Sequence, residues 1–350
     1  MSHTIQRSKT RAALPLVSAL VCTRSRGDGI VATIESILKN DYPDFSLLVL
    51  DQSDDDLTEI AALPFRHDPR FTYLRSKTKG LGSAHNAAIR NLQTELIAIT
   101  DDDCVVPADW LREIVEAFRI DERISMVFGR VAACQYDTNA GYVPVFERDA
   151  PVLLTTIRGD LFRGLGIGAC LALKRSAWQA VRGFDEKLGP GAPLGSMEDR
   201  DMGIRLLLAG YAVYYTPRVV VTHYGFRKNR ELRGLAFRDW FGFGTSYAKY
   251  LKCGQWTISR YMIRQMWIGQ ALGHSFNYLR VARRLGRVTP VLTFWLGFVA
   301  GLAAAVDRDT TLFKGQRVIE EAVVGRRAPD GESAAHAGAH ARRAPDRREG

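Results

Sequence analysis

The most informative stretch of this chain is Leu-Ile-Ala-Ile-Thr-Asp-Asp-Asp, at positions 96 to 103. The apolar run 96–99 is typical of a strand buried on both faces of a sheet, and the polar residues after it mark the carboxyl end of that strand. Adjacent carboxylates repel one another, and a divalent cation is the usual compensation. Because Mg²⁺ and Mn²⁺ prefer one or two carboxylates together with phosphate oxygens, Asp101–Asp103 predict a site for a metal ion and a diphosphate.

Short apolar runs and helical patterns alternate on both sides of this stretch. Apolar runs at 16–22 and 47–50 enclose a segment in which Ile30, Ile34 and Ile37 recur at helical spacing. Further strands are expected at 124–131, 169–173 and 211–221, and further helices at 84–92, 109–118 and 202–209. The alternation predicts an α/β fold with one doubly wound, mostly parallel sheet of the nucleotide-binding kind, covered by helices on both faces and ending near Thr222.

Polar side chains gather where the strands of this sheet end, and ligands of open α/β sheets bind at that edge. The chain places Thr23 and Arg24 after the first strand, Asp51 after the second and Asp101–Asp103 after a later one. Three strands therefore deliver polar or acidic groups to one rim. The neighbouring acids at 54–56 are interpreted as ordinary loop and helix-cap residues.

A second acidic group follows a flexible loop. Gly183-Phe-Asp-Glu leads into a Gly- and Pro-rich stretch that ends at Gly195, and Glu198-Asp-Arg-Asp then opens a helix. Carboxylates at a helix start commonly just complement the helix dipole. The flexible loop and the separate acids at 101–103 favour a functional interpretation, in which one acidic group holds metal and diphosphate and the other accepts a proton. Transfer of a sugar to a hydroxyl requires this division of labour.

In their order and spacing, these motifs resemble the family 2 glycosyltransferases with the glycosyltransferase A fold. The resemblance covers roughly residues 15–223. It rests on Pro15-Leu-Val-Ser-Ala-Leu-Val-Cys-Thr-Arg, Val49-Leu-Asp-Gln-Ser, Gly80-Leu-Gly-Ser-Ala-His-Asn, Thr100-Asp-Asp-Asp, Gly183-Phe-Asp-Glu and Glu198-Asp-Arg-Asp. It implies a sheet of the glycosyltransferase A type and an inverting glycosyltransferase that uses Mn²⁺ or Mg²⁺.

The resemblance also implies roles for individual residues. Contacts to the donor nucleotide are expected from Thr23, Arg24, Asp51, Asn86, Asp101 and Asp102. Asp101 and Asp103 would form the D-x-D pair that meets diphosphate and metal, and Asp199 would be the general base. His223 matches a position where some enzymes of this fold place a third metal ligand, with a structural role as the alternative. A helix-start role is equally open for Asn86.

The glycine-rich stretch Gly164-Leu-Gly-Ile-Gly-Ala superficially matches a dinucleotide-binding fingerprint, but it precedes a strand instead of following one. We expect Gly168 to allow close approach of the backbone to the acceptor or the sugar, with a plain loop as the alternative. Glu198 and Asp201, beside the expected base, are assigned to the same acceptor and sugar side.

Two departures from the family pattern bear on the substrates. Many relatives have an acid or an Asn where this chain has Gln52, so a UDP-sugar is only the default donor. The Gln-x-x-Arg-Trp signature of processive polysaccharide synthases is absent after Glu198-Asp199. This absence favours addition of a single sugar to a glycan or lipid-linked acceptor, in polysaccharide, glycolipid or cell-envelope glycan synthesis.

Two other classes of function stay open. A nucleotidyltransferase that makes a nucleotide sugar would need a glycine-rich, basic loop directly after the first strand, and residues 23–29 partly supply one. A non-enzymatic binding protein could keep the fold without turnover. The intact Asp101, Asp103 and Asp199 argue against this second alternative.

The positive charge is concentrated in one segment. The whole chain has a net charge of +10, and residues 224–306 carry thirteen Lys or Arg and two acids, a net +11 that leaves about −1 for the rest. The segment is also rich in Trp, Tyr and Phe. An anionic membrane surface is therefore the expected partner, in preference to nucleic acid, and an ordinary helical cap is the alternative. Residues 288–306 have no charge, so a single membrane span is just possible.

Four segments are expected in the chain: a flexible N-terminal arm at 1–14, a catalytic domain at 15–225, a basic aromatic helical appendage at 226–320 and a disordered tail at 325–350. The tail has too few large apolar groups to pack. The five cysteines lack C-x-x-C spacing and the arm lacks the apolar stretch of a secretory signal. We therefore expect a cytoplasmic protein, held at the inner face of the plasma membrane by its appendage.

Overall fold

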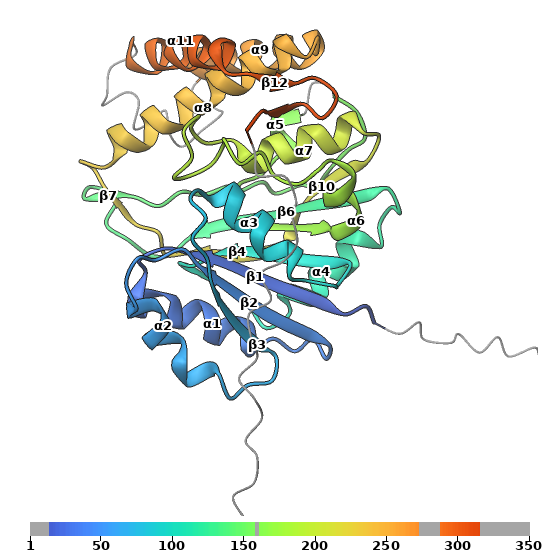
Figure 1. Ribbon diagram of the computed structural model, residues 1–350, viewed down its shortest axis with the longest axis vertical. Helices are drawn as coiled ribbons and strands as arrows, with labels where there is room; N and C mark the ends of the chain where they lie inside the picture. Colours follow the sequence, from blue (N-terminus) through green and yellow to red (C-terminus); the bar gives the residue numbers. More distant parts are fainter. Residues whose placement is uncertain (1–13, 158–160, 273–287, 316–350) are drawn as a thin grey trace, which may run out of the picture.

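The computed structural model describes residues 14–157, 161–272 and 288–315 (Figure 1). The predictions for the N-terminal arm, except its last residue, and for the tail lie outside these residues. Within them, the main sheet has nine strands. They are β1 (Val17–Thr23), β2 (Phe45–Asp51), β3 (Phe71–Arg75), β4 (Leu96–Asp101), β5 (Cys104–Val105), β6 (Ile124–Ala133), β8 (Val152–Leu154), β9 (Cys170–Lys174) and β10 (Ala212–His223).

The order across the sheet is β3-β2-β1-β4-β9-β6-β10-β5, and β8 pairs with β10. Strands β1, β2, β3, β4, β6 and β10 run in one direction, which confirms the predicted mostly parallel sheet. Strand β9 runs against them between β4 and β6. Its sequence did not indicate this direction, because a central strand is apolar on both faces whichever way it runs.

Helices cover both faces of the sheet. On one face, α1 (Val31–Leu38), α2 (Leu57–Ala62) and α4 (Trp110–Phe118) contribute to one buried core. On the other face, α3 (Leu81–Arg90), α6 (Arg175–Ala180) and α7 (Glu198–Leu208) contribute to a second. Two short 3-10 helices, η1 (Gly27–Ile30) and η2 (Leu63–Phe65), flank α1 and α2 in the chain, and α5 (Leu161–Gly164) precedes β9. The doubly wound arrangement agrees with the sequence prediction.

The C-terminal helices form an outer layer beyond α7 (Figure 1). They are α8 (Leu232–Lys252), α9 (Trp256–Leu272) and α11 (Val288–Ala303). Tyr250, Ile258 and Phe294 belong to the same buried core as the helices on that face of the sheet. The hydrophobic core therefore continues through residue 225, where the sequence suggested a boundary, and the layer packs as a cap.

The uncharged segment at 288–306 is split in the structure. Its first part is α11, which has 16 residues, and Val306 begins the short strand β12 (Val306–Asp307), which pairs with β13 (Leu312–Phe313). A further small sheet joins β7 (Gly141–Tyr142) to β11 (Arg227–Lys228). Among the helices at 14–157, 161–272 and 288–315, none is long and apolar enough to cross a membrane.

Candidate active site

A cavity of about 210 Å³ opens at the carboxyl ends of β1 and β2. Parallel pairing sets Thr23 beside Asp51 and Cys22 beside Asp101, so these strand ends meet at one edge as predicted. The Thr23 hydroxyl donates to Asp102 Oδ2 at 2.5 Å. The lining residues are Cys22, Thr23, Arg24, Gln52, Gly80, Leu81, Asp102, Pro190 and Gly191.

The structure corrects the assignment of Asp51 to the wall of this cavity. Asp51 is 0% exposed, and its carboxylate accepts the Ser53 amide at 2.8 Å and the Tyr73 hydroxyl at 2.5 Å. A buried carboxylate needs such donors, so Asp51 is committed to supporting the loop behind the cavity. The next residue, Gln52, lines the cavity and donates from its amide to the Thr78 hydroxyl at 2.8 Å.

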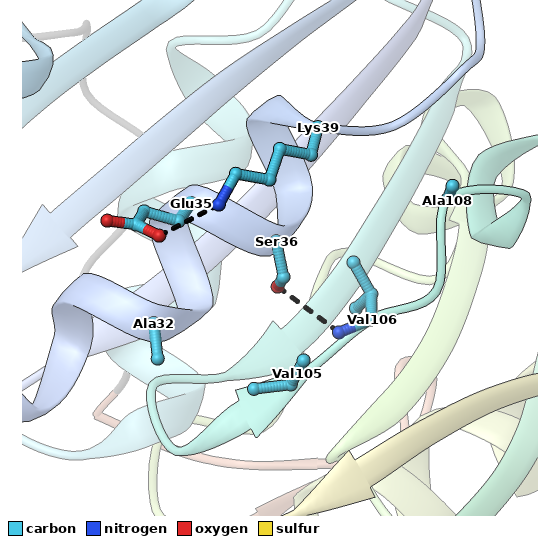
Figure 2. Close-up of a pocket in the computed structure, with 7 residues that line it drawn as sticks. All are labelled: Ala32, Glu35, Ser36, Lys39, Val105, Val106 and Ala108. Atoms are coloured by element: carbon cyan, nitrogen blue, oxygen red, sulfur yellow. Dashed lines mark hydrogen bonds and ion pairs between the residues drawn. The ribbon is translucent and has the colours of Figure 1, made fainter.

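A larger cavity, of about 340 Å³, lies away from these strand ends, between α1 and the segment after β5 (Figure 2). Its polar groups bond to one another: Lys39 pairs with Glu35 at 2.9 Å, and the Ser36 hydroxyl accepts the Val106 amide at 3.2 Å. No unpaired polar groups are seen to converge on it in Figure 2, so we assign no ligand to it.

Two of the predicted metal ligands, Asp103 and His223, come together beside the smaller cavity. Strand β5 pairs antiparallel with the end of β10, and this pairing brings His223 Nε2 to 3.0 Å from Asp103 Oδ1. Burial and the neighbouring Asp103 raise the pKa of Asp101 to about 7. Burial also raises the pKa of Asp103, but the hydrogen bond to His223 and the charges of Arg26 and Arg227 outweigh it and bring this pKa to about 2.

The donor atoms of this cluster suit Mn²⁺ or Mg²⁺. The His223 Nδ1 lies 2.8 Å from the Pro144 carbonyl, which fixes Nδ1 as the donor, so Nε2, which bonds to Asp103 in this structure, is the nitrogen that would bind an ion. The Cys104 thiol lies in the same group, but burial raises its pKa well above the usual value and keeps it protonated. The Asp103 carboxylate and the His223 imidazole therefore fit the implied ion, since hard cations prefer oxygen to sulfur.

Arg26 is a residue of this site that the sequence analysis did not single out. Its guanidinium bonds to Asp102 and, at 3.0 Å, to Asp103. Arg24, which the resemblance placed at the donor, lines the cavity but pairs with the exposed Asp54 at 3.3 Å. The sequence contained an indication of this role, because adjacent carboxylates are stabilised by a nearby positive charge and the loop at 23–29 contains arginines.

The second acidic group is on α7 (Glu198–Leu208), near enough to the first for their charges to interact. Asp199 lies in the first turn of α7, and the Gly168 amide donates to its Oδ2 at 2.7 Å. The glycine-rich loop at 164–168 is further tied to α7 by Arg200 Nε, which donates to the Gly166 carbonyl at 3.2 Å. The charge of Asp199 contributes to the raised pKa of Asp101, so the two acidic groups interact electrostatically. Gly168 thus orients the candidate base.

The structure corrects the assignment of Asp201 to the acceptor side. Asp201 is 0% exposed and lies 2.8 Å from Arg205, 2.5 Å from Lys249 and 2.6 Å from the Tyr250 hydroxyl. Two residues span about 200° around a helix, so Asp201 points into the core when Asp199 points to the rim. Glu198 is also buried, and burial raises its pKa to about 8.

The structure also corrects the expected donor contact of Asn86. Its amide oxygen accepts from Trp178 Nε1 at 3.0 Å and from the Phe184 amide at 2.8 Å, and its amide nitrogen donates to the Phe184 carbonyl at 2.9 Å. Gly183 has φ +78°, and a Cβ there would lie 2.6 Å from the Asn86 oxygen. Asn86 therefore holds the Gly183-Phe184 loop onto α3.

Comparisons with known proteins agree with this arrangement. Residues 18–177 match Glycosyl transferase family 2. Chondroitin synthase of Escherichia coli is 24% identical over 58% of this chain and 28% of its own length. UDP-Glc:alpha-D-GlcNAc-diphosphoundecaprenol beta-1,3-glucosyltransferase of Escherichia coli is 31% identical over 45% of this chain and 59% of its own length. A mannosyltransferase from Pyrobaculum calidifontis, solved with GDP-Man and Mn²⁺, has a TM-score of 0.54 at 19% identity and covers 85% of this chain and 77% of its own.

The fold is thus that of the glycosyltransferase A class, with its acidic groups at the expected edge of the sheet. The chain carries a family 2 glycosyltransferase domain, as its motifs indicated. The match covers 28%, 24% and 51% of the length of the first curated relatives, all of them longer proteins.

Proposed function

We propose that this protein transfers a single sugar, with inversion, from a nucleotide-diphosphate sugar to an acceptor hydroxyl. The observation that carries the proposal is the pair of Asp103 and His223 beside the cavity at the strand ends, with Asp101 near enough to feel the charges of Asp103, His223 and Asp199. A leaving diphosphate and an attacking hydroxyl need these two separate acidic groups.

Each part of the site then has a role. The walls formed by Thr23 and Gln52 bind the nucleoside, and Asp103 with His223 holds Mn²⁺ or Mg²⁺. Asp101, the other carboxylate of the D-x-D pair, assists them. That ion, when bound, neutralises charge on the diphosphate. Asp199, fixed by the Gly168 amide at 2.7 Å, accepts the proton of the acceptor hydroxyl.

The names of similar proteins guide the choice of substrates. One relative is named for a UDP-glucose donor and a diphosphoundecaprenol-linked acceptor, and the structural neighbour was solved with GDP-Man. A UDP-sugar and a glycan or lipid-linked acceptor are therefore our working assignment, in cell-envelope glycan or polysaccharide synthesis. A lipid-linked acceptor would also explain a location at the inner face of the plasma membrane.

The nucleotidyltransferase alternative is weakened by the position of Arg26. In that reading, the loop at 23–29 would hold a triphosphate, whereas Arg26 bonds to Asp102 and Asp103. Incubation with a sugar phosphate and a nucleoside triphosphate tests it directly. Release of pyrophosphate would support the alternative, and release of nucleoside diphosphate from a nucleotide sugar supports sugar transfer.

Replacing Asp103 by Ala should abolish the metal-dependent binding of a nucleoside diphosphate. Asp103 is 9% exposed and is the carboxylate bonded to His223, so its loss removes one of the ligands proposed for the ion. Calorimetric titration of UDP and GDP, with Mn²⁺ and then with EDTA, measures this effect. Asp54→Ala is the matched control, because the Asp54 side chain is 88% exposed and should leave binding unchanged. Diphosphate affinity that is indifferent both to the Asp103 variant and to EDTA would refute the metal assignment.

A further inference from the structure

Helices α8 and α11 pack with their backbones almost in contact. A Cβ on Gly244 of α8 would collide with the Phe294 carbonyl of α11, and one on Gly297 would collide with the Phe241 carbonyl of α8. A Cβ on Gly301 would lie 2.7 Å from the Thr245 carbonyl. Small residues spaced four apart are a common way for helices to pack in lipid. Gly297 and Gly301 therefore lie on the side of α11 that faces α8.

The outer side of α11 is apolar and open. Five large side chains at spacings of three and four residues are 42–63% exposed there, and they form one stripe along the helix: Leu292, Trp295, Leu296, Val299 and Leu302. The sequence of α11 contains no Asp, Glu, Lys or Arg. Figure 1 shows α11 at the outer edge of the molecule, on the side away from α1 and α2. A continuous apolar stripe of this kind is uncommon on a free surface.

We propose that this outer face of α11 lies in the interface of an anionic lipid bilayer. The proposal deepens the membrane location given above and does not depend on which sugar is transferred. As a helix of 16 residues, α11 is about 24 Å long against a hydrocarbon core of about 30 Å, so it lies along the membrane and does not cross it.

The positive charge of the outer helices favours anionic lipid, and not a second copy of the chain, as the partner that covers the outer face of α11. Within the described residues, exposed Arg233, Arg260 and Arg264 belong to the same outer layer of helices. Two such basic surfaces repel each other, whereas anionic headgroups attract them. The Lys252 ammonium donates to the Leu302 and Ala304 carbonyls at 2.8 and 2.5 Å. These backbone carbonyls at the C-terminal end of α11 therefore have a hydrogen-bond partner, which a helix end in contact with lipid needs.

The test is sedimentation of the full chain with vesicles of phosphatidylcholine alone and of phosphatidylcholine with phosphatidylglycerol. Truncation is unsuitable, because removing α8 would take Lys249 from the buried Asp185 and Asp201. The variant is therefore the double change Leu296→Glu and Val299→Glu. The matched control is Leu57→Glu and Ile60→Glu, a pair on α2 that is 63% and 58% exposed.

We expect the wild type and the α2 control to bind the anionic vesicles, and the α11 variant to bind at least about tenfold more weakly. High salt should weaken binding of the wild type. Circular dichroism and nucleoside diphosphate binding show whether each variant is folded, so failure here is distinguishable from failure of the proposed function. Equal vesicle binding by the α11 variant and the wild type would overturn the proposal. The proposal would also be overturned if light scattering showed a wild-type dimer that does not bind vesicles and the α11 variant were monomeric. A second copy of the chain would then cover the outer face of α11.

Discussion

Replacing Asp199 by Asn should slow sugar transfer by at least about a hundredfold and leave donor affinity near normal, because loss of a general base costs about 10²–10⁴ in rate. The acceptor hydroxyl loses its proton as it attacks from the side opposite the diphosphate, so the base must stand apart from the metal-binding carboxylates. Asp199 lies on a separate element, α7. Asn keeps an oxygen that can accept the Gly168 amide, so the fold should persist.

The measurements are initial rates and donor dissociation constants with a panel of UDP- and GDP-sugars. Glu198→Gln is the matched control. Burial raises the pKa of Glu198 to about 8, so this side chain is largely neutral at pH 7 and Gln is a close mimic. A large rate defect in Glu198→Gln, with Asp199→Asn nearly active, would move the base to Glu198.

The pH profile of the same reaction gives an independent check. Burial raises the pKa of Asp199 from its ordinary value, and this effect exceeds the opposing contributions of Arg200 and the Gly168 amide. The base works only when ionised, so the rate should fall as the pH drops through this raised pKa. Asp199→Asn should lack that acid limb.

Replacing Lys249 by Met should lower the free energy of unfolding by about 3–5 kcal/mol, the usual cost of removing one partner from a buried ion pair. Lys249 Nζ lies 2.9 Å from Asp185 Oδ2 and 2.5 Å from Asp201 Oδ1, and all three side chains are 0% exposed. Arg205 still pairs with Asp201 in the variant, whereas Asp185 loses its cation. Urea unfolding of the full chain measures the difference.

Lys39→Met is the matched control, because Lys39 and Glu35 form a surface pair that is 73% and 47% exposed. Such pairs contribute about 0–1 kcal/mol. Adding Asp185→Asn to Lys249→Met should recover part of the lost stability, since the second change removes the buried negative charge that Lys249 balanced. Equal effects of the two Lys→Met changes would show that the buried network contributes no more than a surface pair.

The same network predicts how stability depends on pH. Burial raises the pKa of Asp201, but Lys249 and Arg205 outweigh it and lower this pKa below its ordinary value. The stabilisation from Asp201 is therefore complete above the unfolded-state pKa of about 3.9 and is lost as the pH falls through the lower folded value. Acid unfolding monitored by circular dichroism should show this loss for the wild type, and a smaller one for Lys249→Met.

Local sequence was sufficient for the α/β class, the predominant strand direction and the edge of the sheet that carries the site. Apolar runs that end in Thr23, Asp51 and Asp101 indicate buried parallel strands, and such strands bring their carboxyl ends together. The convergence of Asp103 with His223 also agrees with the motif pattern. These features depend on short-range patterns and on rules that all parallel sheets obey.

Only the tertiary structure decided which polar side chains line the cavity and which are buried in the core, where they bond to other parts of the chain. Asp201 and Asn86 are as polar as their neighbours, and the sequence gives no sign that Lys249, 64 residues from Asp185, makes a buried ion pair with it. The basic segment accordingly suggested a separate appendage, whereas its helices complete the core of the domain. The physical reason is that a charge is buried only where a partner from elsewhere in the chain meets it, and such a meeting leaves no local pattern.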